Sequence, residues 1–247
     1  METTGSAIAN SHSSPTVWRQ VIRDTVCGVS IDDTAEGLDI PHDTVFHMRH
    51  KILYCVEQSI IALPPQLDGV CEADETYVLE NVKGRKISEN YHRKPRKHSA
   101  KARKPGISDE YICVQTSINE NGENIALSVN RATPSKAELC EVFEGRITDD
   151  TVILCDGNKN YDVLEDKCTV AHVKRTNKVN GFHSFIKERL RAARGVATIY
   201  QNRYNALFSK IFGRQDCAVN KIFELMTSCN GSFSSKSDVM SKNLLSI

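Results

Sequence analysis

The spacing of apolar residues changes near residue 65. Before it, apolar residues recur every three or four positions, as in TVWRQVIRDTV (16–26), which predicts amphipathic helices. From Gly69 onward they form short β-branched runs between turn residues, which predicts strands. The chain of 247 residues therefore predicts a helical region over 15–62 and an α/β domain over 66–215.

Residues 1–14 are small and polar, and we expect them to form a disordered tail. We expect a C-terminal tail over 216–247, which is Ser-rich and loose from Ser228 onward. Within the helical region, Ser30 followed by Asp33 predicts a capped helix start. Pro41 predicts the start of a second helix soon afterwards.

Two short helices joined by a tight turn are typical of a helix-turn-helix. We expect the second helix to expose a basic face toward DNA; its members are His42, His47, Arg49, His50 and Lys51. Of these, His47, Arg49 and Lys51 are the predicted DNA contacts. An ordinary helical hairpin with a solvated basic face is the alternative.

The second region alternates between strand and helix patterns. Strands are predicted at 69–80, 111–118, 125–131, 151–156 and 168–173. One helix is predicted to run from its cap Ser135 to about Arg146, and a short helix follows Asp156. The last element is predicted to be a long helix, or a pair of helices, from about Asn180 to Phe212. The order β-β-β-α-β-α-β-α predicts a mixed sheet with helices on its faces. This is the order of the ribonuclease H-like fold, an analogy at the level of fold alone.

Acidic residues occur where strands normally carry apolar ones. Asp74 and Glu75 lie inside the first strand, and Asp156 ends the fourth. Two carboxylates that converge at a sheet edge repel each other unless a divalent cation lies between them. Side chains alternate along a strand, so only one of Asp74 and Glu75 enters such a site, and the pattern leaves open which. Asp156 before Gly157 is also an ordinary turn pattern.

The net charge of +1 hides one strongly basic segment. Residues 83–104 hold ten Lys/Arg against one acid, and few apolar residues, which predicts a loop that binds the DNA backbone. Its predicted DNA contacts are Arg93, Lys94, Arg96, Lys97, Lys101, Arg103 and Lys104. A second basic stretch, residues 174–194, holds seven Lys/Arg and one acid.

The nine cysteines form no CxxC pair and are odd in number. They predict reduced thiols rather than a disulfide framework, and no zinc site. The sequence shows neither an apolar run of membrane-spanning length nor a signal peptide. We therefore expect a cytoplasmic protein without a membrane partner.

Several motifs, in this order, resemble one known family. They are ADETYVLENVKG, the basic segment with AKARKPGIS, ILCDGNKNY, and HVKRTNKVNGFHSFIKERLRAARGVATIYQNRY. Together they resemble the DDE-type transposases of bacterial insertion sequences, in particular the ISXO-type group. TAEGLDIPHDTVFHMRHKIL also resembles the helix-turn-helix of that group, so the likeness covers roughly residues 16–212.

The resemblance implies roles for four residues. Asp74, Asp156 and Asn180 fall on the family's metal ligands for Mg²⁺ (or Mn²⁺), and Lys187 on its basic catalytic residue, which also contacts DNA. Asn180 and Lys187 are seven residues apart, nearly two helical turns, and so share a face. Two alternatives stay open: Asn180 caps the helix, or Glu188 substitutes as the third acid.

The implied function is metal-dependent DNA strand cleavage and strand transfer of an insertion sequence. The implied partners are the element ends and target DNA, with a homo-oligomer on DNA at the nucleoid and no small-molecule cofactor. The family usually carries a cysteine-rich zinc ribbon ahead of the helix-turn-helix; we expect none here, because no cysteine precedes Cys27. The alternatives are therefore a catalytically decayed or domesticated DNA-binding protein, and a related nuclease that cuts without joining.

Overall fold

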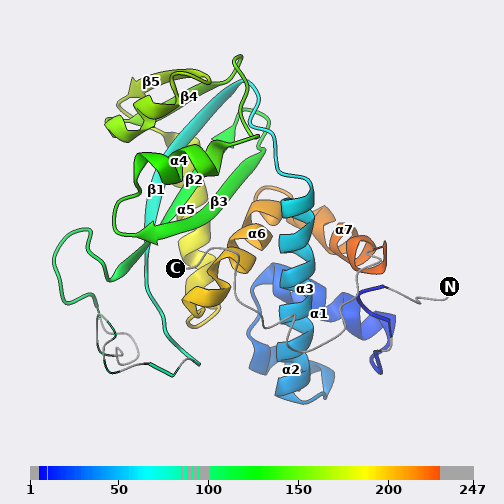
Figure 1. The fold of residues 1–247 in the computed structure, drawn as a ribbon. Helices are drawn as coiled ribbons and strands as arrows, with labels where there is room; N and C mark the ends of the chain where they lie inside the picture. Colours follow the sequence, from blue (N-terminus) through cyan, green and yellow to red (C-terminus); the bar gives the residue numbers. More distant parts are fainter. Residues whose placement is uncertain are drawn as a thin grey trace.

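The computed structural model describes residues 6–9, 11–84, 86–87, 89, 91, 94 and 101–228. Figure 1 shows a sheet with its flanking helices beside a group of helices drawn from both ends of the chain. None of the helices in the described part of the chain is both long and apolar enough to cross a bilayer.

The sheet has five strands in the order β3-β2-β1-β4-β5. Their bounds are β1 Val70–Leu79, β2 Tyr111–Asn119, β3 Asn124–Arg131, β4 Val152–Asp156 and β5 Thr169–Val173. β1, β2 and β3 pair antiparallel, whereas β1, β4 and β5 pair parallel. The mixed α/β sheet is thus confirmed, and it is consistent with a ribonuclease H-like fold.

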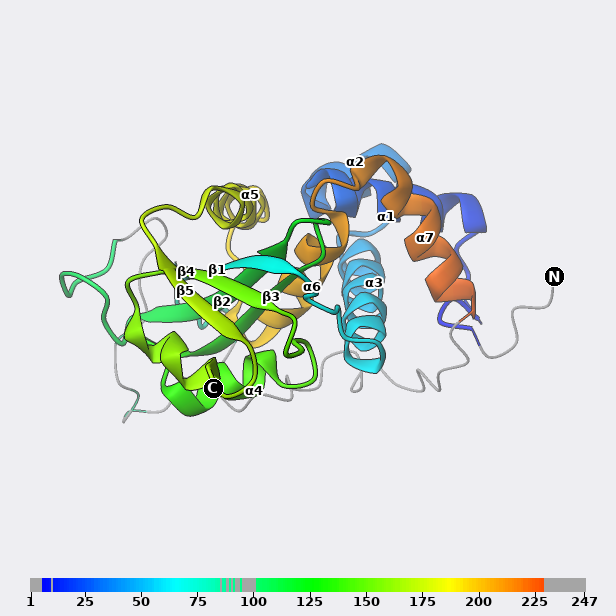
Figure 2. The ribbon, with the colours of Figure 1, turned by 90° about the horizontal axis from the view of Figure 1, so that it is seen from above.

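Helices cover both faces of the sheet. Figure 2 shows α5 (Asn177–Ala192) on one face and α4 (Lys136–Phe143) on the other. The 3-10 helix η1 (Lys159–Leu164) packs beside α4. Ser135 starts α4 with a capping box, as its sequence predicts, because its hydroxyl and the Glu138 carboxylate each bond the other residue's backbone N–H.

The remaining α-helices form one bundle, and the 3-10 helix η2 (Thr198–Tyr200) directly precedes one of them. The bundle helices are α1 Pro15–Cys27, α2 Ile31–Leu38, α3 His42–Ala62, α6 Gln201–Ile211 and α7 Gln215–Ser228. The predicted cap of α2 is present, since Asp33 N donates to Ser30 Oγ at 3.1 Å. α3 packs on α6, and α6 also packs on β3, so α6 joins the bundle to the sheet. A buried ion pair, Arg203 Nε to Glu57 Oε2 at 3.2 Å, crosses the α3–α6 contact.

The disorder expected over 1–14 is wrong where the structure describes those residues, and the C-terminal tail expected from residue 216 is helical up to Ser228. Ala7 and Ile8 are buried in the core, and Ala7 N donates to Met226 O at 3.0 Å. α7 packs on α1 and buries Ala218, Ile222 and Met226. The apolar stripe of α7 covers α1, so the two chain ends stabilise each other. Residues 1–5 and 229–247 lie outside the described residues.

Candidate active site

Two carboxylates stand side by side on neighbouring strands. The parallel pairing of β1 and β4 ends at Ala73 opposite Cys155, so the next residues are Asp74 and Asp156. Neighbours in parallel strands point to the same face of a sheet. The Asp74 side chain is 17% exposed, and Asp156 is exposed at the strand end. The arrangement leaves one partly buried and one open carboxylate at the same edge.

The pKa of Asp74 reflects both its burial and the charges of its neighbours. The pKa of Asp74 is raised to about 6, mainly by burial and in addition by the negative charge of Asp156. A hydrogen bond from Glu75 N to Asp74 Oδ1, at 2.8 Å, and the positive charge of Lys187 both lower it. Asp74 therefore lies within the electrostatic reach of both Asp156 and Lys187, and positive charge placed between the acids would favour its ionised form.

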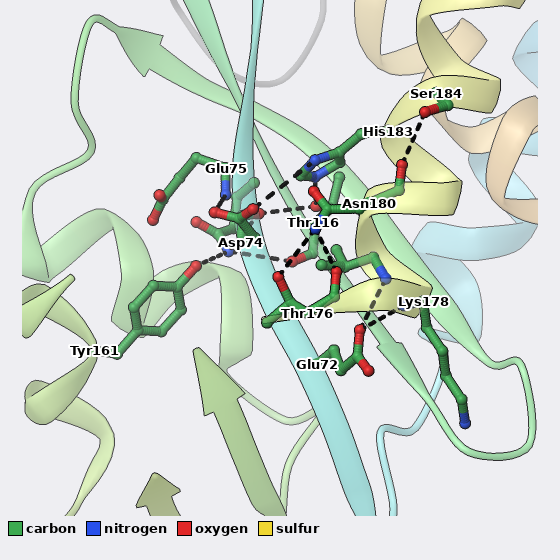
Figure 3. Close-up of polar contacts among 12 residues, drawn as sticks. Glu72, Asp74, Glu75, Thr116, Tyr161, Thr176, Lys178, Asn180, His183 and Ser184 are labelled. Atoms are coloured by element: carbon green, nitrogen blue, oxygen red, sulfur yellow. Dashed lines mark hydrogen bonds and ion pairs between the residues drawn. The ribbon is translucent and has the colours of Figure 1, made fainter. Parts of the chain in front are cut away.

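The structure decides which acid of the first strand faces this site. Glu75 points to the opposite face, where Asn158 Nδ2 donates to Glu75 Oε1 at 3.0 Å and Tyr161 also hydrogen-bonds it. Burial raises the pKa of Glu75. Asp74 instead faces His183 of α5, as Figure 3 shows. The alternation of the strand thus sends Asp74 toward α5 and Glu75 toward η1.

An acid two residues earlier fixes α5 on the strand. Glu72 Oε2 accepts from Lys178 N at 2.7 Å and from Val179 N at 3.1 Å. These are N–H groups of the first turn of α5, which lacks a side-chain cap of its own. A carboxylate at this position also complements the helix dipole. Glu72 shares a strand face with Asp74, and that spacing was the signal available for finding it.

Asn180 lies inside the first turns of α5, not at its cap. The N-cap is Thr176, so the capping alternative is wrong. Asn180 Nδ2 donates to Thr176 O at 2.5 Å. Because that backbone carbonyl only accepts, the amide nitrogen must face it, which leaves Oδ1 as the end of the amide that can bind a cation. Lys187 and Glu188 are both exposed two turns further along the helix.

His183 is a further residue of the site that the sequence analysis missed. It is 6% exposed, and its Nδ1 lies 4.0 Å from Asp74 Oδ2. Its Nε2 lies 2.5 Å from Thr116 Oγ1 on β2. Burial, and then the charge of Lys187, lower the pKa of His183 to about 4, so the ring is neutral at pH 7. Its position three residues after Asn180, on the same helical face, was the available signal.

The donor set suits a hard divalent cation but is small. Within the described residues, no group of three or more His, Cys, Asp or Glu side chains is placed to hold a metal ion. Asp74, Asp156 and Asn180 instead offer two carboxylates and one amide oxygen, ligands that Mg²⁺ and Mn²⁺ accept. Mg²⁺ commonly keeps several waters or substrate phosphates as ligands, so a site with few protein donors fits it.

Two buried glutamates that flank the basic segment, Glu80 and Glu110, accept hydrogen bonds from residues within it. Glu110 Oε2 accepts from Arg103 N at 2.6 Å and from Lys104 N at 3.1 Å. Glu80 Oε1 accepts from Tyr91 Oη at 2.5 Å and from Arg131 Nη2 at 2.7 Å.

The predicted DNA contacts of this segment are only partly described. Lys94, Lys101, Arg103 and Lys104 are exposed, and Lys104 Nζ pairs with Asp109 at 2.7 Å. Because of that ion pair, Lys104 is the weakest candidate of the four. Arg93, Arg96 and Lys97 lie outside the described residues.

The expected exposure of the basic face of α3 is wrong for two residues. Arg49 is 5% exposed and donates through Nη2 to Val29 O at 2.8 Å. His50 is 3% exposed, and its ring packs against Phe46 and Tyr200. Both side chains are buried inside the bundle because α1, α2, α6 and α7 all pack against α3.

The other members of this face differ in exposure. His47 and Lys51 are half-buried, and His42 is exposed beside Asp32 and Asp43. The surface of α2 and of the α2–α3 turn is acidic; its exposed acids are Asp32, Asp33, Glu36, Asp39 and Asp43. A negative surface repels DNA phosphates, so these residues give the helix-turn-helix prediction no support.

The eight cysteines in the described part of the chain form no disulfide.

Comparison with known proteins leaves the family open. No family model and no curated protein matches the chain. Among solved structures, a pre-cleavage Mos1 transpososome is 12% identical with a TM-score of 0.29, covering 78% of this chain and 74% of that one. The Mos1 strand transfer complex is 12% identical with a TM-score of 0.31, covering 76% and 72%. A Mos1 mariner paired-end complex with Mn is 13% identical with a TM-score of 0.29, covering 78% and 74%.

These TM-scores are too low to carry an argument on fold or function. The fold therefore rests on the strand order and pairing of this chain, and the ISXO-type group stays a prediction.

Proposed function

We propose that this protein is a DDE-type transposase that cleaves DNA strands and transfers them with the help of a divalent cation. The proposal depends on one observation. Asp74 and Asp156 are neighbours on the parallel strands β1 and β4, and Asp74 faces α5. Two like charges in that position are stabilised by a cation between them. Asp156 ends its strand, at the sheet edge where ligands gather in open α/β sheets.

Each residue of the site has a distinct role in this proposal. Asp74, Asp156 and the Asn180 oxygen hold Mg²⁺ or Mn²⁺, and Lys187 binds a DNA phosphate beside them. A divalent cation in such a site polarises phosphoryl oxygens and activates water or a DNA 3′-hydroxyl. The exposed basic residues Lys101 and Arg103 bind the DNA backbone near the same sheet. The protein acts on the element ends and target DNA, as a homo-oligomer, at the nucleoid.

A strand-transfer assay tests the proposal. The full chain is incubated with DNA that carries the element's own ends, with Mg²⁺, Mn²⁺ or EDTA, and nicked and joined products are separated. We expect products only with a divalent cation, and a loss of at least about 100-fold in Asp74→Asn and in Asp156→Asn, because each removes a charged ligand. DNA binding should persist in both variants.

Two matched controls make the assay selective. Glu188→Gln and Asp150→Asn each remove one exposed acid outside the site and should leave activity unchanged. Full activity of Asp74→Asn would refute the site.

Catalytically inactive DNA binding is the second candidate. It is favoured by the small donor set, since the third ligand position carries a neutral amide and the described residues hold no cluster of three His, Cys, Asp or Glu. Tight, cation-independent DNA binding without any nicked product, in the same assay, would select it over the transposase. Nicked product without joined product would select a nuclease.

A further inference from the structure

The contact between Thr116 and His183 fixes which imidazole nitrogen carries the hydrogen. Thr116 lies opposite Asp74 in the β1–β2 pairing, and its Oγ1 is 2.8 Å from Asp74 O and 2.5 Å from His183 Nε2. The Asp74 carbonyl only accepts, so the single hydroxyl hydrogen of Thr116 is donated to it. Thr116 Oγ1 must then accept from the ring, and Nε2 carries the hydrogen.

The other ring nitrogen consequently presents a lone pair to the carboxylate. In a neutral imidazole with a hydrogen on Nε2, Nδ1 is an acceptor. His183 Nδ1 faces Asp74 Oδ2 at 4.0 Å, a separation beyond hydrogen-bond distance. Asp74 Oδ1 already accepts from Glu75 N. Among the described residues, Oδ2 therefore keeps its lone pairs for a ligand from outside the protein. Figure 3 shows this arrangement between β1, β2 and α5.

We infer that Thr116 and His183 are positioning residues that hold the ring in the Nε2–H tautomer and so keep Asp74 Oδ2 available to a divalent cation. The opposite tautomer would aim an Nδ1–H donor at Oδ2 and compete with the cation for the same lone pairs. The metal part of this inference rests on the proposed function, whereas the tautomer does not.

The burial of both partners makes the arrangement stable. Thr116 is 0% exposed and His183 is 6% exposed, so water has little access to replace either partner of their hydrogen bond. The ring contacts Thr116 of β2, and its neighbours Phe182 and Ile186 on α5 are buried as well. Outer residues that orient a metal ligand typically change metal affinity by about 10- to 100-fold when they are replaced.

Two measurements on the DNA-free full chain test the inference. Long-range ¹H–¹⁵N correlation spectra read the tautomer of His183, and titration with Mn²⁺, followed by the paramagnetic resonance of the free ion, reads cation affinity. We expect the Nε2–H tautomer in the wild type. Thr116→Val removes the hydroxyl at a similar shape, and should shift the ring toward Nδ1–H and weaken Mn²⁺ binding about tenfold or more.

Thr116→Ser is the matched control, because it keeps the hydroxyl and should preserve both the tautomer and the affinity. A second pair covers the case in which Thr116→Val folds poorly. His183→Gln retains an N–H donor for Thr116 and an oxygen toward Asp74, and should stay within a few-fold of the wild-type affinity. His183→Leu keeps the bulk but neither polar group, and should lose the affinity that Gln retains.

Different results overturn the inference and the proposed function. An Nδ1–H tautomer in the wild type, or wild-type Mn²⁺ affinity in both Thr116→Val and His183→Leu, would overturn the positioning role. Unchanged Mn²⁺ binding in Asp74→Asn would instead overturn the metal site of the proposed function, whatever tautomer the spectra show.

Discussion

Helices α5 and α3 carry similar basic residues but use them differently. In α5, Lys187 is exposed, and its charge acts on Asp74 across the site. In α3, Arg49 is buried, and its guanidinium bonds the backbone of Val29. α5 packs on β1 and β2 and leaves Lys187 exposed, whereas α3 packs against α1, α2, α6 and α7. Basic residues on a helix therefore predict a DNA-binding face only if they are exposed, and their exposure depends on the elements that pack against the helix.

The largest expected effect is a loss of cleavage when Asn180 of α5 is replaced. Asn180→Ala removes the amide oxygen and should lower cation-dependent cleavage about 100-fold, while Asn180→Glu retains part of it because a carboxylate fills the same position. Cleavage rates and melting temperatures should be measured on the same proteins. Asn180→Ser tests a purely structural role, since a hydroxyl can still bond Thr176 O. Wild-type cleavage in Asn180→Ala would remove Asn180 from the site.

The next effect concerns stability rather than DNA. Arg49→Met should lower the free energy of unfolding by about 1–3 kcal/mol, because it removes a charged donor and leaves Val29 O without that partner. Urea unfolding measures the loss. Lys51→Met on the same helix is the control, and should change stability less, since Lys51 is only half-buried. If Arg49→Met leaves stability unchanged but weakens binding to the element ends, Arg49 contacts DNA, as the sequence predicted.

A smaller effect is expected at Lys187. Lys187→Gln should weaken DNA binding severalfold and reduce the slope of log K against log[salt] by about 0.9, because one phosphate contact is lost. The melting temperature should stay the same, since Lys187 is exposed. Fluorescence anisotropy at several salt concentrations gives both values. Lys210→Gln, a single-charge change on exposed α6 surface, is the control, and an equal loss there would make the effect one of net charge.

The last expected effect is a pH dependence of stability at His50. Burial, followed by the charges of Arg203, His47 and Arg49, lowers the pKa of His50 from 6.5 to about 4. Between these values the unfolded chain binds a proton that the folded chain does not, so His50 destabilises the fold as the pH falls from 6.5 toward 4.

The loss is at most about 1.4 kcal/mol for each pH unit in that interval. His50→Gln should flatten the fall in stability between pH 6.5 and 5, as urea unfolding at both values would show. An unchanged pH profile would mean that other groups, not His50, cause the acid sensitivity.

The sequence alone determined the strands, the α4 and α2 caps and the mixed sheet. These depend on local rules: apolar alternation, turn residues, and Ser with Glu or Asp three positions on. It also placed Asp74 in a strand and Asp156 at a strand end, because strand identity is a local property. The last helical region was expected as one helix or two, and the structure resolves it into α5 and α6.

Only the tertiary structure decided which side chains meet. It set Asp74 rather than Glu75 toward α5, brought Glu72 to the start of that helix, and placed Thr116 against His183. It also buried Arg49, where the sequence suggested an exposed contact, and packed α7 on α1, where the sequence suggested only a C-terminal tail. The physical reason is common to these cases. Burial and hydrogen-bond partners come from segments distant in sequence, and a single helix or strand pattern contains no information about the element that covers it.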